Sequence, residues 1–225
     1  MNIRCITLGN FLVNSYLLQD STTGYSIVVD TGDGPELADA LTSMSPMPDV
    51  RAIFLTHAHF DHAGGLVDLQ CKFPEAIAYL PDLERQLFDI LPKQGSVFFG
   101  MSELNRPCGR IDCYVKDGDI VKVGELCFHF LSTPGHTPGQ GCFYNDKYVF
   151  SGDTLFAGSI GRTDFPLSDP KLMSKSLRRL FKELPGHLLV YSGHGPSTTL
   201  EKELYSNPFL EFIRCERGIV KDSDS

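Results

Sequence analysis

The stretch THAHFDH, residues 56–62, concentrates three of the seven histidines of this 225-residue chain beside one aspartate. His57 and His59 follow directly after a short apolar run, so an extended backbone would point both imidazoles from one face toward a single ion. Asp61 and His62 come next, where a helix is expected to begin and the chain can aim two more ligands at a neighbouring point. The spacing therefore predicts two adjacent metal sites.

Later in the chain, three more residues of ligand type each follow an apolar run and a turn of small residues: His136, Asp153 and His194. We therefore expect the ends of four strands to converge, one from the histidine-rich stretch and three from these positions. A catalytic zinc typically takes three protein ligands and keeps one coordination position for water. Five histidines and two aspartates divide into two such sets that share one carboxylate.

The two remaining histidines and the cysteines give no such signal. His129 lies inside the apparent strand CFHFL, and His187 follows a Pro-Gly turn, so both are expected to be structural or surface residues. The seven cysteines are scattered without a CxxC pair, and most stand in apolar stretches. This distribution predicts buried, reduced thiols and a reducing compartment, which we take to be the cytoplasm.

Composition narrows the classes of function. With 20 Lys and Arg against 28 Asp and Glu, the formal charge is −8 and no basic run appears, so nucleic acid and anionic membrane surfaces are not expected partners. No segment approaches the roughly 18 consecutive apolar residues of a membrane span. The length and the 42% apolar residues favour one domain over residues 1–225.

Short runs rich in β-branched and aromatic residues alternate with helix-like stretches. Strands are expected at residues 3–8, 15–20, 25–30, 51–56, 76–80, 126–131, 147–152 and 188–193. Helices are expected at residues 35–44, 62–73, 82–91 and 169–184, with a further helix starting at a capping box of Thr198 and Glu201. This interleaving predicts an α/β or α+β fold with layered sheets.

Two further groups of residues have open roles. In the irregular stretch 95–112, Phe98, Phe99 and Met101 either wall a substrate pocket or simply pack, and simple packing is the more common case. The late cations are expected to be solvated surface charges: Lys202, Arg214, Arg217 and Lys221.

The HxHxDH pattern, with Gly64 and Gly65 after it, resembles the metallo-β-lactamase-fold hydrolases. The likeness runs from about residue 1 to residue 210 and includes four further segments: TPGHTPG (133–139), SGDTLF (151–156), GRTDFP (161–166) and SGHGPSTTLEKE (192–203). Within this superfamily the chain is similar to the glyoxalase II-like, or hydroxyacylglutathione hydrolase-like, branch. The resemblance implies an α/β (α+β) fold in the form of a four-layer αβ/βα sandwich, with a binuclear metal site at one edge.

The resemblance also implies roles for individual residues. The seven ligand candidates fall into a first-metal set, a second-metal set and a bridging residue: His57, His59 and His136; Asp61, His62 and His194; and Asp153. Asp30, in VVDTG, matches a supporting acid behind the ligands, although at the end of a strand it could equally be a turn former. The expected cofactors are two divalent ions, zinc in the first place and iron or manganese as alternatives.

The implied reaction is hydrolysis of a thioester. Divalent ions bring the pKa of bound water close to neutrality, so a hydroxide held between them would attack the carbonyl of S-lactoylglutathione or a related hydroxyacyl thioester. The departing thiol, of pKa about 8.5, needs little help from an acid. Asp61 is the candidate catalytic residue, accepting the water's hydrogen bond. Full-length glyoxalase II carries a further helical domain whose basic residues grip glutathione, and we expect that domain to be missing here.

Two alternatives stay open. A persulfide dioxygenase of the same superfamily would use one iron, corresponding here to His57, His136 and Asp153. The GG that follows the histidine cluster and the sequence GSIGRTDFP favour hydrolysis. The other alternative is a binding protein that has kept the fold without activity, and the seven intact ligand positions argue against it.

Overall fold

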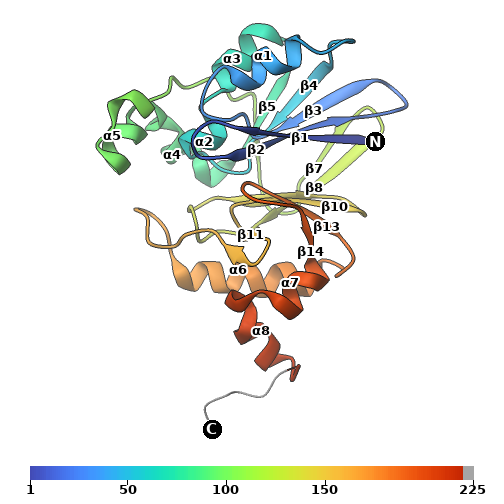
Figure 1. Cartoon of the computed structure of the whole chain (residues 1–225), viewed down its shortest axis with the longest axis vertical. Helices are drawn as coiled ribbons and strands as arrows, with labels where there is room; N and C mark the ends of the chain where they lie inside the picture. Colours follow the sequence, from blue (N-terminus) through green and yellow to red (C-terminus); the bar gives the residue numbers. More distant parts are fainter. Residues whose placement is uncertain (220–225) are drawn as a thin grey trace.

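The computed structural model describes residues 1–219 and shows two six-stranded sheets facing each other (Figure 1). The first sheet contains, in spatial order, β1 (Asn2–Leu8), β2 (Val13–Gln19), β3 (Tyr25–Val29), β4 (Asp49–Phe54), β5 (Ile77–Pro81) and β6 (Cys113–Val115). Strands β1 to β3 pair antiparallel, and β3 to β6 pair parallel through helical crossovers.

The second sheet comes from the later part of the chain. Its spatial order is β14 (Thr198–Thr199), β13 (Leu189–Ser192), β10 (Tyr148–Gly152), β9 (Gly141–Tyr144), β8 (Leu126–Ser132) and β7 (Ile120–Val123). Only β10 and β13 pair in parallel among these described strands. A small hairpin of β11 (Leu155–Phe156) and β12 (Ser159–Ile160) follows β10.

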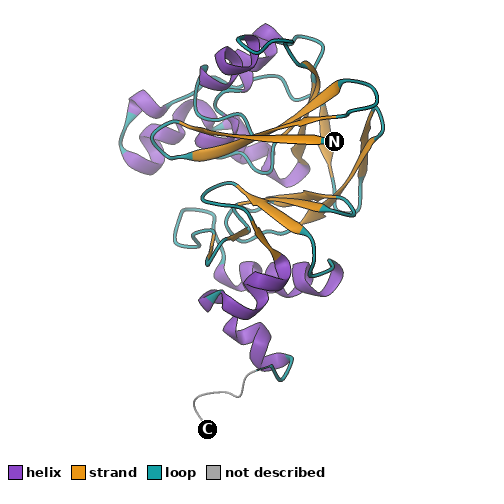
Figure 2. Ribbon diagram, turned by 45° about the vertical axis from the view of Figure 1, so that its right-hand side comes forward, coloured by secondary structure: helices purple, strands orange, loops and turns teal. Residues whose placement is uncertain are grey.

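Helices cover the outer face of each sheet (Figure 2). The first half contributes α1 (Glu36–Thr42), α2 (Phe60–Ala63), α3 (Leu66–Lys72), α4 (Arg85–Asp89) and α5 (Gln94–Phe99). The second half contributes α6 (Pro170–Glu183), α7 (Leu200–Ser206) and α8 (Glu211–Glu216). Within residues 1–219, no helix is both long and apolar enough to cross a bilayer.

Alternation along the strands produces the four layers. In β3, Ile27 and Val29 join the apolar cluster between the sheets, whereas Val28 belongs to the cluster under the first helices. In β4, Phe54 lies between the sheets and stacks on Phe143 of the second sheet, with ring centroids 4.4 Å apart. A third apolar cluster joins the second sheet to its helices. The predicted α/β fold with an αβ/βα arrangement is confirmed.

Two of the predicted helices are interrupted. The expected helix 62–73 is split into α2 and α3 at Gly64 and Gly65, and a Cβ on Gly65 would overlap the carbonyl oxygens of Thr31 and Gly34. The glycine pair thus lets the chain after the histidines pass close to the loop after β3. The expected helix 82–91 is a 3₁₀ turn at Asp82–Glu84 followed by α4.

The predicted capping box of Thr198 and Glu201 is wrong by one residue. Thr199 is the N-cap of α7 and accepts a hydrogen bond from the Lys202 backbone N–H at 3.1 Å. Thr198 instead pairs in β14 and donates its hydroxyl to Glu203 Oε1 at 2.6 Å. From the sequence alone, either of the two adjacent threonines could be the N-cap. The pairing of Thr198 in β14 leaves Thr199 to cap the helix.

The prediction of buried thiols is wrong for most of the cysteines. Cys142 is buried, whereas four others are exposed: Cys5, Cys71, Cys108 and Cys113. Cys5, for example, lies on the edge strand β1, in which only Leu8 is buried. Apolar neighbours in the sequence therefore do not decide the burial of these side chains.

Two of the late cations are structural rather than freely solvated. Arg214 Nη1 donates to the carbonyl oxygens of Leu204 at 3.1 Å and Asn207 at 2.7 Å, at the end of α7. Arg217 donates to the carbonyl oxygen of Phe181 at 2.7 Å. Lys202 is exposed, as expected, and Lys221 lies outside the described residues.

Candidate metal centre

A buried aspartate fixes the start of the histidine-rich stretch. Asp30 Oδ1 accepts the Thr56 backbone N–H at 2.8 Å, and Oδ2 accepts the Thr56 hydroxyl at 2.9 Å. The same Oδ2 accepts a hydrogen bond from His62 Nδ1 at 2.9 Å. With Nδ1 bonded to Asp30, Nε2 is the nitrogen of His62 that faces the other ligand candidates. Asp30 thus has the contacts expected of a supporting acid.

Two further buried residues brace the same stretch, and sequence reasoning missed both. Glu84 accepts the Ala58 N–H at 2.8 Å and the Gly139 N–H at 2.7 Å, so it joins the loops on either side of the site. Gln94 accepts the Phe60 N–H at 2.9 Å and donates to the Ala58 carbonyl oxygen at 2.7 Å. Neither side chain is exposed to solvent. No sequence signal marked them, because Glu84 lies within the expected helix 82–91 and Gln94 comes just after it.

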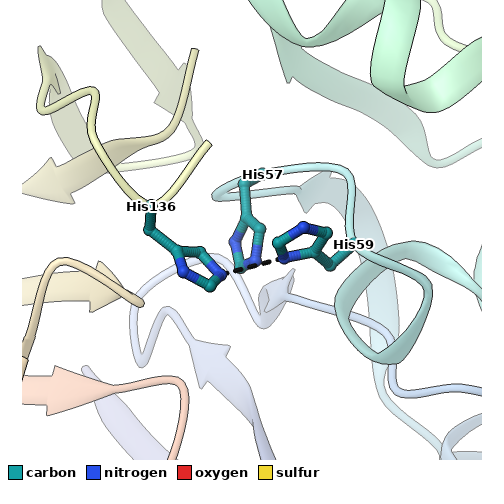
Figure 3. A group of neighbouring side chains, drawn as sticks. All are labelled: His57, His59 and His136. Atoms are coloured by element: carbon teal, nitrogen blue, oxygen red, sulfur yellow. Dashed lines mark hydrogen bonds between the residues drawn. The ribbon is translucent and has the colours of Figure 1, made fainter. Parts of the chain in front are cut away.

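The first-metal set is assembled from both halves of the chain. His57 and His59 follow β4, and His136 follows β8; Figure 3 shows the three rings pointing toward one another. His136 Nδ1 donates to the Arg162 carbonyl oxygen at 2.8 Å, which turns its Nε2 inward, 2.9 Å from His59 Nδ1. One ligand atom from each of the three residues lies within 4.8 Å of the others.

The second-metal set lies directly beside the first. His194 Nε2 is 3.6 Å from Asp61 Oδ2, and His62 Nε2 is 3.9 Å from the same oxygen. Asp153 stands between the sets: its Oδ1 is 3.4 Å from His62 Nε2, and its Oδ2 is 3.4 Å from His136 Nε2. The structure therefore brings together all seven residues that the sequence singled out.

The donor atoms of this cluster fit divalent cations. His57 Nε2, His62 Nε2 and Asp153 Oδ1 are buried and have no hydrogen-bond partner, although an unpaired buried polar atom is destabilising. A Cβ on Gly193 would overlap Asp153 Oδ1 and be 2.6 Å from His62 Cε1, so glycine there leaves room beside these donors. Imidazole and carboxylate donors suit zinc, iron and manganese.

Electrostatics separate the two sets. Burial, together with the neighbouring histidines, holds the pKa of His57 and of His59 well below the usual range, so both rings are neutral and offer lone pairs. Burial also opposes the charged form of His62, but the carboxylates of Asp153, Asp61 and Asp30 outweigh it and raise its pKa to about 10. In the absence of metal, His62 therefore holds a second proton, and a bound cation would replace it at Nε2 beside these three carboxylates.

A cavity of about 240 Å³ opens onto five of the seven ligand candidates. Phe98 and Phe99 line it and Met101 does not, so two of these three apolar residues wall a cavity at the candidate metal centre. His129 stacks on Tyr144 with ring centroids 5.3 Å apart, and His187 is exposed. Among residues 1–219, neither of these two histidines belongs to a cluster able to hold an ion.

Comparisons with known proteins agree with this geometry. The family model of the metallo-beta-lactamase superfamily matches residues 8–194. Hydroxyacylglutathione hydrolase GloC of Haemophilus influenzae is 33% identical over 218 residues, which cover 93% of this chain and 98% of that protein.

Two crystal structures are similar over nearly their whole length. The BLEG-1 B3 metallo-beta-lactamase is 32% identical with a TM-score of 0.84, covering 93% of this chain and 99% of that one. TTHA1623 in a di-iron-bound form is 36% identical with a TM-score of 0.79, covering 92% of this chain and all of that one (100%). Family match, sequence identity and fold agree, and the chain belongs to the metallo-beta-lactamase superfamily.

Proposed function

We propose that this chain is a metal-dependent hydrolase that cleaves thioesters, with S-lactoylglutathione and related hydroxyacyl thioesters as the first candidate substrates. The observation that carries the proposal is the convergence of three buried donor atoms without partners, His57 Nε2, His62 Nε2 and Asp153 Oδ1. The similarity to a hydroxyacylglutathione hydrolase supports the thioester as the substrate class.

The ligand roles proposed for the seven residues follow the two sets described above, with Asp153 between them. Bound there, two divalent ions supply a water of lowered pKa as nucleophile and positive charge for the carbonyl oxygen. Zinc is the proposed metal because two or three nitrogens and a carboxylate per ion are its usual protein ligands. Iron is the alternative, supported by the di-iron form of one structural relative.

Asp61 is the proposed catalytic residue. Its carboxylate lines the cavity, and Oδ2 lies 3.6 Å from His194 Nε2. A carboxylate in this position can accept the hydrogen bond of the attacking water and fix its direction of approach. The thiol leaving group has a pKa of about 8.5, so it departs as the thiolate without a dedicated acid.

The proposed setting is the cytoplasm, with a small-molecule thioester as the partner. Four of the cysteines are exposed, and exposed thiols persist in a reducing compartment. Measuring the activity in the cytoplasmic, membrane and extracytoplasmic fractions of the source cells would test this placement. Recovery of the activity outside the cytoplasmic fraction would reject it.

The test of the function is hydrolysis of S-lactoylglutathione by protein that has been stripped with a chelator and reloaded with zinc. We expect two ions per chain, loss of activity on stripping and its recovery on reloading. His57→Ala and His194→Ala should each lower activity by at least about 100-fold. His129→Ala is the matched control, because His129 lies in β8 away from the cluster. A reloaded protein with two ions that cleaves no thioester would reject the proposal.

Persulfide dioxygenation at one iron is the second candidate function. It would need only His57, His136 and Asp153, and the 3.4 Å between Asp153 Oδ2 and His136 Nε2 supports such a site. The complete second-metal set favours hydrolysis. His194→Ala separates the two activities, because it should abolish hydrolysis and spare dioxygenation. Oxygen uptake with glutathione persulfide, together with one iron per chain, would favour this alternative.

A further inference from the structure

Apart from the five ligand candidates, the walls of the cavity at the metal centre are built almost entirely from phenylalanine. Six of these residues line it: Phe11, Phe60, Phe98, Phe99, Phe156 and Phe165. They come from the β1–β2 turn, α2, α5, β11 and the loop before α6, so separate segments deliver the same side chain to one place. A substrate carbonyl that reaches the metal centre must carry one of its two attached groups into this space.

The rings form a continuous surface beside both metal sets. Phe60 lies 5.0 Å from Phe11 and 5.7 Å from Phe99, measured between ring centroids, and Phe99 lies 6.0 Å from Phe165. Phe165 reaches the first-metal set, with its centroid 6.0 Å from that of His59. On the other side, Phe156 lies 5.8 Å from His194. Any group held there contacts aromatic rings on both sides.

The lining offers little to a charged group. Among the described residues that line the cavity, Arg162 is the single lysine or arginine. Its guanidinium already donates to both carboxylate oxygens of Asp164 at 2.8 Å and lies over the Phe165 ring, 4.1 Å from its centroid. A carboxylate entering the cavity would therefore share this guanidinium with Asp164 rather than meet an unpaired cation.

The volume limits what can enter. About 240 Å³ is below the roughly 300–1,000 Å³ of pockets that enclose drug-sized ligands, so only a compact group fits. A glutathionyl group carries two carboxylates and an ammonium, which suit neither the volume nor the lining. The thiol part of a thioester would therefore extend toward solvent and leave the cavity to the acyl part.

We propose that the acyl group of the substrate is compact, uncharged and apolar, aromatic or branched aliphatic, and occupies this cavity beside the metal-binding side chains. The thioester linkage itself rests on the proposed function. A charged acyl group loses its hydration in the cavity and gains at most a guanidinium that is already paired, whereas an apolar group is removed from water and packs against the aromatic walls. The preferred acyl group is thus more apolar than lactoyl.

The first experiment measures binding and does not depend on turnover. Phenylacetate and succinate, each offering a carboxylate to the metals, are titrated into the zinc-loaded protein by calorimetry. We expect phenylacetate to bind at least about tenfold more tightly. Phe165→Ala should remove most of that difference, and Phe165→Leu, which keeps an apolar wall, should retain part of it. Phe209→Ala is the matched control, because Phe209 is 51% exposed and lies outside the cavity.

The second experiment compares the glutathione thioesters of phenylacetate and lactate by kcat/KM. A ratio of at least about ten in favour of phenylacetyl, reduced in Phe165→Ala, is the expected result. Equal or tighter binding of succinate, or a preference for the lactoyl thioester, would overturn the inference. Tight binding of phenylacetate with hydrolysis of neither thioester would instead reject the hydrolase proposal and leave the cavity preference standing, so the two failures are distinct.

Discussion

Asp30 and His62 are joined by a hydrogen bond of 2.9 Å in which both side chains are almost completely buried. The carboxylate belongs to the loop after β3, and the imidazole belongs to α2. Because the bond occupies Nδ1, it sets the direction in which the other ring nitrogen offers its lone pair. The alignment of the second-metal set therefore depends on a residue that is not one of its members.

Asp30→Asn should weaken metal binding about 10- to 100-fold at the second-metal set, because the amide cannot accept from both Thr56 and His62. Competition with a chromophoric chelator measures the affinity of each of the two ions. Asp146→Asn, at an exposed turn position, is the control. If the affinity of both ions is unchanged in Asp30→Asn, Asp30 only shapes the turn after β3.

Glu84→Ala should destabilise the metal-free protein by about 2–5 kcal/mol, because it leaves the buried N–H groups of Ala58 and Gly139 without an acceptor. Urea unfolding measures the free energy of unfolding. The matched change at an exposed position, Glu75→Ala, should stay within about 0.5 kcal/mol of the wild type. Similar values for the two variants would contradict the bracing role.

Asp20 should account for part of the loss of folding stability at acidic pH. Hydrogen bonds from the Thr23 hydroxyl and from the backbone N–H groups of Glu125 and Thr22 lower the pKa of Asp20 from 3.8 to about 2. Because the folded value lies below the unfolded one, the stabilisation is complete above pH about 4 and is lost as the pH falls toward 2.

The variant Asp20→Asn removes this titration, so its free energy of unfolding should fall less steeply than that of the wild type between pH 4 and 2. Urea unfolding at several pH values measures both slopes. The slope of Asp146→Asn should match that of the wild type. Parallel slopes for wild type and Asp20→Asn would count against the low pKa.

Removal of metal should lower the melting temperature. Ions that bind only the folded state stabilise it by about 2.7 kcal/mol when their free concentration is 100 times the Kd. Differential scanning calorimetry with zinc or with a chelator measures the difference. It should shrink in His57→Ala and persist in His129→Ala. The same melting temperature with zinc and with the chelator would mean that the cluster holds no ion in solution.

The sequence predicted the metal centre better than it predicted its surroundings. A local pattern, an apolar strand followed by a turn of small residues, precedes each of His136, Asp153 and His194. The structure keeps this pattern, and the four strand ends converge as expected. The layered fold could also be predicted from local sequence, because alternation along strands such as β3 determines which side chains lie between the sheets.

Glu84 and Gln94 could not be found in this way. In a helix-like segment, a glutamate and a glutamine look like solvent-facing residues, and only the tertiary structure shows which buried backbone groups they satisfy. The break at Gly65 has the same origin, since the backbone it contacts comes from the loop after β3. These features depend on segments that are distant in the sequence.

Each metal set draws ligands from both halves of the chain, after β4 in the first sheet and after β8 or β13 in the second. Ions seated there would act as cross-links between the halves, so the halves could not swing apart without releasing them. Metal retention then becomes a property of the whole sandwich. Loosening the Phe54–Phe143 stack, which joins the two sheets, should therefore hasten release of the ions although neither ring is a ligand.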